Sequence, residues 1–60
     1  MRLLVVEDEP DLLAGLVRAF RDEGYAVDSA ADGGEGLFKA ELNDYDAIVL
    51  DVMLPTASRP

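Results

Sequence analysis

The stretch "AIVLDVMLP", residues 47–55, is the most informative segment of this 60-residue chain. Four apolar residues in succession are typical of a short strand that is covered on both faces, as in parallel α/β sheets. Asp51 follows them directly, and burying an ionised carboxylate is costly unless another group compensates its charge. The stretch therefore predicts a buried strand that delivers an acidic group to the end of a sheet.

A second apolar run, "LLVV" at residues 3–6, ends in three consecutive acids at residues 7–9. Pro10 suits the first turn of a helix, where its missing N–H costs nothing, and Gly24 is typical of the residue just beyond a helix end. Between them, apolar residues recur at helical spacing: Leu12, Leu13, Leu16, Val17 and Phe20. We expect a strand followed by an amphipathic helix, and we assign the apolar stripe of that helix to the protein core.

The middle of the chain repeats this order of elements. Residues 25–30, "YAVDSA", are typical of a shorter strand, and Asp32 with Glu35 three positions later forms a capping-box pattern at the start of a helix. We expect this helix over residues 33–43, weakened by its early glycines, and a third strand over 47–51. The order strand–helix–strand–helix–strand, joined by right-handed crossovers, predicts an α/β protein with a doubly wound parallel sheet and helices on both faces.

Composition excludes several classes of function. The formal net charge of −8, from 13 acids against 5 Lys and Arg, opposes direct binding to nucleic acid or to an anionic membrane. The chain has no His and no Cys, which removes the usual zinc ligands and any disulfide. Its start does not resemble a signal peptide, and no segment is long enough to span a bilayer. We therefore expect a cytoplasmic protein with no direct nucleic-acid or membrane partner.

Acidic side chains follow two of the three expected strands. Glu7 and Asp8 come after the first strand, and Asp51 comes at the end of the third. In open α/β sheets ligands bind beyond the carboxyl ends of the strands, so these carboxylates are expected near one edge. Close like charges disfavour each other's ionisation, and a divalent cation removes that cost. Oxygen-only ligands favour Mg²⁺; the alternative for Glu7 and Asp8 is a solvated, helix-capping loop.

Three segments carry a resemblance to a known family: "LLVVEDEPDLL", "EGYAVDSAADGGEGL" and "YDAIVLDVMLP". They resemble the receiver domain of bacterial two-component response regulators, particularly the OmpR/PhoB-type transcription factors. The resemblance covers Arg2 to Pro55 and implies a truncated flavodoxin-like sheet of strand order 2-1-3, with the first strand in the middle. It implies that residues 1–55 are the N-terminal half of a receiver domain and that residues 56–60 are a tail outside the family.

The resemblance also implies a role for individual residues. Asp51 matches the phosphoacceptor, which takes a phosphoryl group from a sensor histidine kinase. Glu7 and Asp8 match the acidic pair that holds Mg²⁺, Asp51 is itself a ligand, and Met53 matches the position whose backbone carbonyl completes the protein ligands. The function implied is phosphorelay signal transduction by a receiver module that is not an enzyme.

The departures from the family leave a second reading open. Thr56 stands where the family has a glycine, and the family's later Lys and switch Ser/Thr have no counterpart; Lys39 lies in the second expected helix. The alternative is a truncated remnant without phosphotransfer activity. In either case the outer edge of the strand at residues 47–51 is expected to be bare, which favours self-association through that edge.

Overall fold

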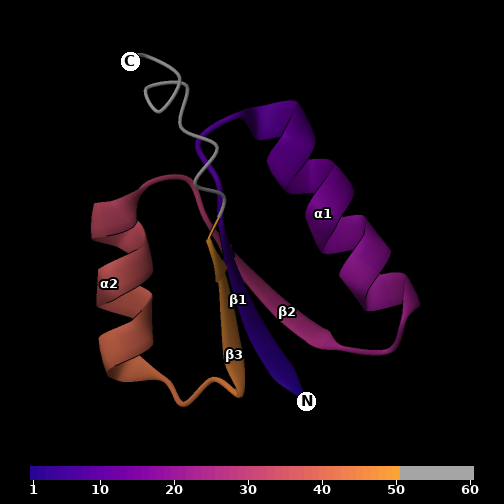
Figure 1. The fold of residues 1–60 in the computed structure, drawn as a ribbon. Helices are drawn as coiled ribbons and strands as arrows, with labels where there is room; N and C mark the ends of the chain where they lie inside the picture. The colour runs from indigo at the N-terminus through magenta and orange to yellow at the C-terminus, as the bar shows by residue number, and fades with distance from the viewer. Residues whose placement is uncertain (51–60) are drawn as a thin grey trace, which may run out of the picture.

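A parallel sheet lies between two helices (Figure 1). The computed structural model describes residues 1–50, so Asp51, Met53 and the expected tail lie outside the described residues. The elements, in order, are β1 (Arg2–Val6), α1 (Pro10–Asp22), β2 (Ala26–Ala30), α2 (Gly33–Leu42) and β3 (Ala47–Leu50). Within the described part, neither helix is long and apolar enough to cross a membrane. The predicted α/β order of elements is confirmed.

The strands are arranged in the order β2-β1-β3, and β1 pairs in parallel with both neighbours. Leu4 lies opposite Ile48, and Val6 lies opposite Ala30 on one side and Leu50 on the other. The strand order 2-1-3 implied by the family resemblance is therefore confirmed. Because all three strands run the same way, their carboxyl ends lie at one edge of the sheet.

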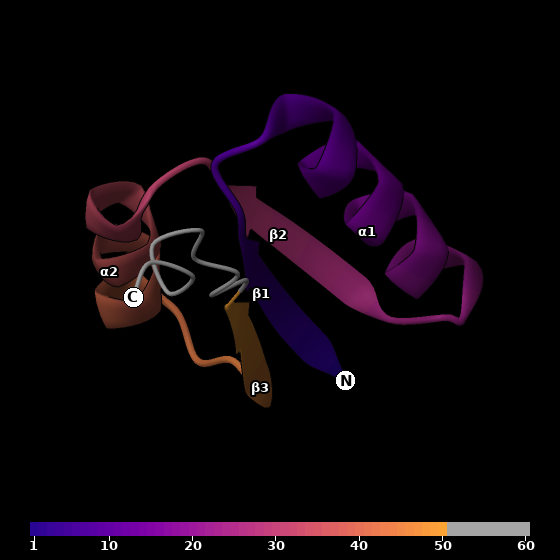
Figure 2. The same ribbon diagram turned by 45° about the horizontal axis from the view of Figure 1, so that its top comes forward.

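In the part of the chain that the structure describes, every buried apolar side chain belongs to β1 or β2. They are Leu3, Leu4, Val5, Val6, Val27 and Ala30. Alternate residues of a strand face opposite sides of the sheet, so β1 supplies side chains to both faces. Ala40 of α2 and Tyr45 pack against the face formed by Leu4, Val6 and Ala30, and α1 lies on the other side (Figure 2). The prediction of helices on both faces is confirmed.

Helix α1 is less buried than its apolar stripe predicts. None of its residues is buried, and Leu12 is 39% exposed, while Leu16 and Phe20 are half-buried. The assignment of this stripe to the core is therefore correct only in part. Within residues 1–50, α1 contacts β1 and β2, but no second helix lies beside it on that face to cover its remaining apolar side.

Helix α1 ends just before Gly24, as the sequence predicts. Gly24 has a φ of +97°, a left-handed conformation that glycine adopts without steric cost. Its N–H donates to the Arg21 carbonyl at 2.9 Å, and the Tyr25 N–H donates to the Phe20 carbonyl at 3.2 Å. The rings of Phe20 and Tyr25 lie 6.1 Å apart. This is a Schellman motif with its usual hydrophobic contact, and it turns the chain into β2.

The start of α2 forms the predicted capping box with one difference. The side chain of Asp32 accepts a hydrogen bond from the Glu35 N–H at 2.7 Å. The side chain of Glu35 accepts from the Ala31 N–H at 2.9 Å, one residue earlier than in the usual box. Both bonds satisfy backbone N–H donors at the junction between β2 and α2.

Gly36 lets α2 approach the sheet closely. It is the buried residue of α2, and a Cβ atom placed there would lie 2.8 Å from Cγ2 of Val6. Val6 is β-branched and belongs to a paired strand, so its side chain has little freedom to move away. The absence of a side chain at position 36 therefore sets the distance between α2 and β1.

The substitution Gly36→Ala should lower the free energy of unfolding by about 1–2 kcal/mol, because overpacking against Val6 exceeds the gain in helix propensity. Gly33→Ala is the matched control, since nothing lies within 4 Å of a Cβ at that position. Urea denaturation of the two variants measures the difference. A Gly36→Ala protein at least as stable as Gly33→Ala would contradict this packing.

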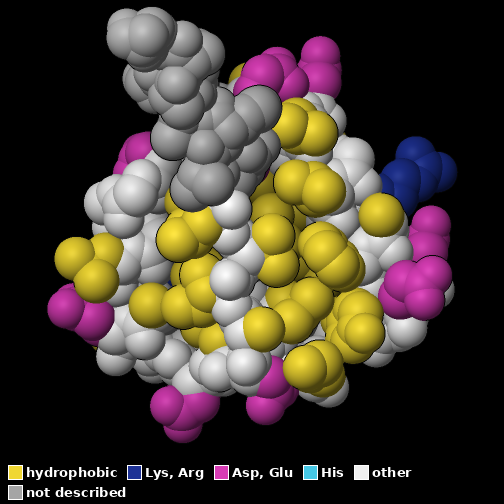
Figure 3. Space-filling model, in the orientation of Figure 1, with side chains coloured by type: hydrophobic (Ala, Val, Ile, Leu, Met, Phe, Trp, Pro, Cys, Tyr) yellow, Lys and Arg dark blue, Asp and Glu magenta, His cyan; other side chains and the backbone are white. Residues whose placement is uncertain are grey.

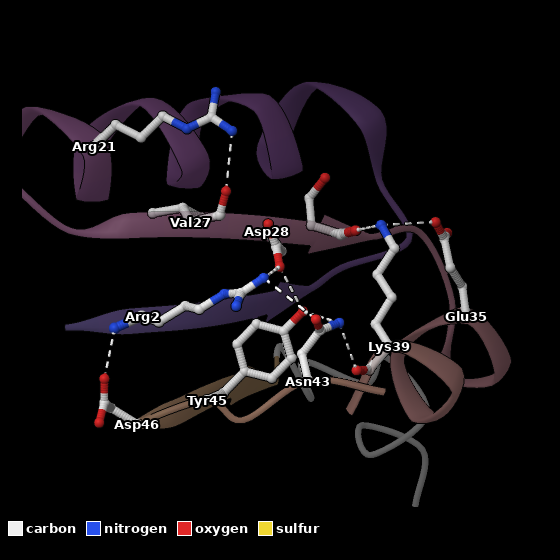
Figure 4. A network of polar contacts seen from close by, with 10 residues as sticks. Arg2, Arg21, Val27, Asp28, Glu35, Lys39, Asn43, Tyr45 and Asp46 are labelled. Carbon is white, nitrogen blue, oxygen red and sulfur yellow. Dashed lines mark hydrogen bonds and ion pairs between the residues drawn. The ribbon is translucent and has the colours of Figure 1, made fainter. Parts of the chain in front are cut away.

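Polar side chains fasten the segment that enters β3 to the start of the sheet (Figure 4). Asp28 accepts a hydrogen bond from the Tyr45 hydroxyl at 2.6 Å and one from Nη2 of Arg2 at 3.0 Å. The Arg2 guanidinium lies 5.2 Å from the Tyr45 ring centre, and the backbone N–H of Arg2 donates to the Asp46 carboxylate at 2.6 Å. The hydrogen bond from Tyr45, followed by the contacts with Arg2, lowers the pKa of Asp28. The chain thereby enters β3 in a fixed position beside β1.

Removing the Tyr45 hydroxyl should raise the pKa of Asp28 toward its ordinary value. A lowered pKa in the folded state stabilises the protein above the unfolded pKa, and this contribution is lost as the pH falls through the folded pKa. Tyr45→Phe should therefore lower the free energy of unfolding at neutral pH. This free energy should also fall less steeply as the pH is lowered. Carbon NMR titration of the Asp28 carboxyl measures the shift, with Tyr25→Phe as the control. An Asp28 titration unchanged by Tyr45→Phe would show that the hydroxyl is not the cause.

Candidate functional site

The predicted site lies where β1 and β3 end. Val6 and Leu50 are opposite each other in the parallel register, so both strands reach the same edge of the sheet. Glu7 follows Val6 in the chain, and Asp51 follows Leu50. The structure thus brings the two strand ends together and places the acidic pair at one of them. Asp51 and Met53 lie outside the described residues, so their convergence on this pair stays a prediction.

Glu7 is a buried carboxylate at the end of β1, with only 5% of its surface exposed. Its backbone N–H donates to the Ala30 carbonyl at 3.1 Å and so extends the pairing with β2. Its carboxylate accepts a hydrogen bond from the Glu9 N–H at 2.8 Å. Glu7 is therefore not solvated, as the alternative expected, but its carboxylate does bind the backbone at the start of α1, as the helix-capping part of that alternative expected.

The other two acids of this turn have separate positions. Glu9 is the N-cap of α1, and its side chain accepts a hydrogen bond from the Leu12 N–H at 2.7 Å, while Pro10 occupies the start of the helix as predicted. Asp8 lies between them and is exposed. Sequence reasoning missed the role of Glu9, because Glu is not among the residues preferred at an N-cap. Asp8 and Glu9 are both exposed, and of these two acids Glu9 already caps α1.

The donor atoms of the site suit a hard cation. Within residues 1–50, no group of three or more His, Cys, Asp or Glu side chains comes close enough to hold a metal ion. The described part supplies the neighbouring carboxylates Glu7 and Asp8, and the chain contains no nitrogen or sulfur ligand of the His or Cys type. Oxygen-only ligands match Mg²⁺ or Ca²⁺ and not zinc or copper. The described half of the site thus fits the expected Mg²⁺.

A groove of about 600 Å³ opens beside this turn, between α1 and β2. Its lining includes Glu7, Asp8, Leu13, Val17, Arg21 and Ser29. The helix contributes apolar side chains, two arginines and Asp22, whereas the turn after β1 contributes the carboxylates of Glu7 and Asp8. The acidic turn is therefore accessible from the face of the sheet that α1 covers incompletely.

Comparison with known proteins gives a family match. The response regulator receiver domain family matches residues 3–58. The transcriptional regulatory protein TcrA of Mycobacterium tuberculosis is 54% identical over 55 residues, which are 92% of this chain and 22% of that protein. The transcriptional regulatory protein DltR of Streptococcus agalactiae is 47% identical over 58 residues, 97% of this chain and 26% of that protein. The chain spans about a quarter of the length of these curated relatives.

If the carboxylates converge, Asp51→Asn should stabilise the metal-free chain by up to about 1 kcal/mol, because it removes one of three like charges. Saturating Mg²⁺ should cancel or reverse this gain. Asp44→Asn is the matched control, since Asp44 precedes β3 and is exposed. Thermal unfolding with and without Mg²⁺ measures both variants. Equal effects of the two substitutions would mean that Asp51 lies away from Glu7 and Asp8.

Proposed function

The chain belongs to the family of response regulator receiver domains, and from this premise we propose that it is the phosphoacceptor module of a phosphorelay in two-component signalling. One structural observation supports this function most strongly. The register of Val6 opposite Leu50 ends β1 and β3 at one edge, and the residues that follow these strands are the acidic pair and Asp51. The match over residues 3–58 favours this function over an inactive remnant.

In the proposed reaction Asp51 is the nucleophile. A carboxylate oxygen of Asp51 forms a bond to the phosphorus of a phosphohistidine on a sensor histidine kinase. The phosphorus–nitrogen bond breaks, and its electron pair returns to the imidazole of the kinase. The product is an aspartyl phosphate on this chain. Because the chain is itself modified and does not release a product, it acts as a signalling module and not as an enzyme.

We propose the following residues as ligands of Mg²⁺. Asp8, Asp51 and the backbone carbonyl of Met53 would hold the ion directly, and Glu7 would act through water. Bound there, Mg²⁺ would supply positive charge for the oxygens of the transferring phosphoryl group. The exposure of Asp8 and the burial of Glu7 support this division, because the Glu7 carboxylate is already engaged by the Glu9 N–H.

The relatives support a proposal about the output of the signal. Their names describe transcriptional regulation, and about three quarters of their length lies outside the matched region. We propose that this receiver module is of the OmpR/PhoB type, in which a winged-helix domain elsewhere in the protein binds DNA. The net charge of −8 makes the receiver part itself unsuited to phosphate contacts.

Incubation with acetyl phosphate and Mg²⁺ should add one phosphoryl group to the chain, seen as a base-labile adduct by intact-protein mass spectrometry. Asp51→Asn should abolish the adduct. Asp8→Asn should raise the Mg²⁺ concentration needed for half-maximal labelling by at least about tenfold, since a direct ligand is lost. Asp44→Asn is the control and should behave as the parent chain.

Two results would contradict the proposal. An adduct that persists in Asp51→Asn would place the phosphoryl group elsewhere. A folded chain that gains no adduct at any Mg²⁺ concentration would favour the inactive remnant. A separate result bears on the metal alone: labelling that is unaffected by EDTA would mean that Asp51 is phosphorylated without Mg²⁺.

A further inference from the structure

Two residues of β2 direct their backbone groups away from the sheet. The Ala26 N–H donates to the Met1 carbonyl at 3.0 Å, so position 26 faces β1. Backbone groups alternate in direction from one residue of a parallel strand to the next, so Val27 and Ser29 face outward. Within residues 1–50 no strand lies beyond them, since the sheet has the order β2-β1-β3. Such outward groups are the ones with which another strand can pair.

A cation from each helix occupies these outward carbonyls. Nη2 of Arg21, in the last turn of α1, donates to the Val27 carbonyl at 3.0 Å. Nζ of Lys39, in α2, donates to the Ser29 carbonyl at 2.5 Å (Figure 4). The two helices lie on opposite faces of the sheet, so the two side chains reach the edge from opposite sides. Both outward carbonyls of β2 are therefore bonded to a positive charge.

A second contact holds Lys39 at this edge. Its Nζ lies 3.3 Å from Oε2 of Glu35, one helical turn earlier in α2. The Glu35 carboxylate is itself fixed, because Oε1 accepts a hydrogen bond from the Ala31 N–H at 2.9 Å. The ammonium group of Lys39 thus lies between a carboxylate and the Ser29 carbonyl, and Glu35 acts as a positioning residue for it.

Cationic side chains are scarce in this acidic chain, which makes their positions informative. The net charge is −8. On the face drawn in Figure 3, acidic side chains lie around the rim, and cationic atoms lie beside α1. The Lys and Arg residues of the described part are Arg2, Arg18, Arg21 and Lys39. Arg21 and Lys39 both bind the same short strand, although either side chain could remain solvated. Cationic side chains at an edge strand discourage pairing with another strand.

We propose that Arg21 and Lys39 block the β2 edge, and that without them a second copy of this chain pairs with it, β2 against β2 in antiparallel orientation. The outward residues Val27 and Ser29 are symmetric about Asp28, so β2 complements itself around a two-fold axis. Opposite residues of an antiparallel pair exchange both of their N–H···O bonds. Val27 of one copy would therefore need the Ser29 carbonyl of the other, and these carbonyls are the atoms that the two cations occupy.

Charge determines when the unblocked edge would pair. In this register Asp28 of one copy lies opposite Asp28 of the other, and like charges at facing positions oppose pairing. Arg2, whose Nη2 lies 3.0 Å from Oδ2 of Asp28, compensates part of this charge. Loss of both edge cations also makes each copy more negative. Because salt screens this repulsion, we expect the unblocked edge to pair mainly at high ionic strength. The proposal does not depend on phosphorylation of Asp51, so either can fail without the other.

The double variant Arg21→Met, Lys39→Met tests the block, because methionine keeps an unbranched side chain and removes the donors. At about 0.5 M salt it should associate at least about tenfold more tightly than the parent chain in sedimentation equilibrium. The N–H groups of Val27 and Ser29 should become protected from hydrogen exchange as it associates, whereas in the parent they should exchange fast at every concentration. The double variant Arg18→Met, Arg59→Met is the charge-matched control and should behave as the parent.

A measurement on the parent chain does not depend on how the double variant folds. Lys39 is the sole lysine of the chain, so its ammonium group gives a single nitrogen NMR signal. Its protons should exchange more slowly than those of a solvated ammonium, and faster again in Glu35→Gln, which removes the positioning carboxylate. Lys39→Met alone frees one carbonyl and should give an intermediate association, while Lys39→Arg keeps a cationic donor and should remain as the parent.

Four results would overturn the proposal. The first is protection of the Val27 and Ser29 N–H groups in the parent as its concentration rises, which would mean that the edge is not blocked. The second is a double variant that associates no more tightly than the charge-matched control. The third is association of the double variant while both N–H groups still exchange fast, which would assign it to another surface. The fourth is a Lys39 ammonium group that exchanges its protons as fast as a solvated one.

Discussion

The parallel pairing of β1 with β3, from Leu3 opposite Ala47 to Val6 opposite Leu50, is the constraint on which the rest of the structure depends. Because β1 is covered on both faces and Leu4 and Val5 are fully buried, its position in the sheet is fixed by packing. A shift of one residue in the pairing would move every side chain of β3 to the opposite face. This register brings the ends of the two strands to one edge, where we expect the acids that follow them to meet.

The strands on the two sides of β1 are buried to different extents. Among residues 1–50, the buried apolar side chains lie in β1 and β2, whereas Ile48 and Leu50 of β3 are exposed. β3 is held by its ladder to β1 and by the polar contacts of Arg2 with Asp46 and of Asp28 with Tyr45. The strand that leads to the proposed phosphoacceptor is thus the less buried partner in the pairing.

Most of the fold could be predicted because its signals are local. Continuous apolar runs defined the strands. Gly24 marked the end of α1, and the Asp32–Glu35 pair marked the start of α2; in both cases the signal lies in the few residues beside the helix end. The contact of Gly36 with Val6 could not be predicted, because a glycine near a helix start also fits a flexible turn, and its partner lies thirty residues away in the chain. The hydrogen bond from Lys39 to the Ser29 carbonyl and the incomplete burial of α1 likewise depend on the tertiary arrangement. For the site, sequence placed the Glu7–Asp8 pair at a strand end, and the convergence with Asp51 remains a prediction.

The central claim is that the β1–β3 register assembles one acidic site from two distant parts of the chain. Mn²⁺ tests it most directly, because it binds oxygen ligands as Mg²⁺ does and broadens the NMR signals of nearby nuclei. The account predicts that substoichiometric Mn²⁺ broadens the amide signals of Asp8 and Asp51 together and leaves the signal of Asp44 sharp. Broadening of Asp8 without Asp51, or equal broadening at all exposed acids, would contradict it.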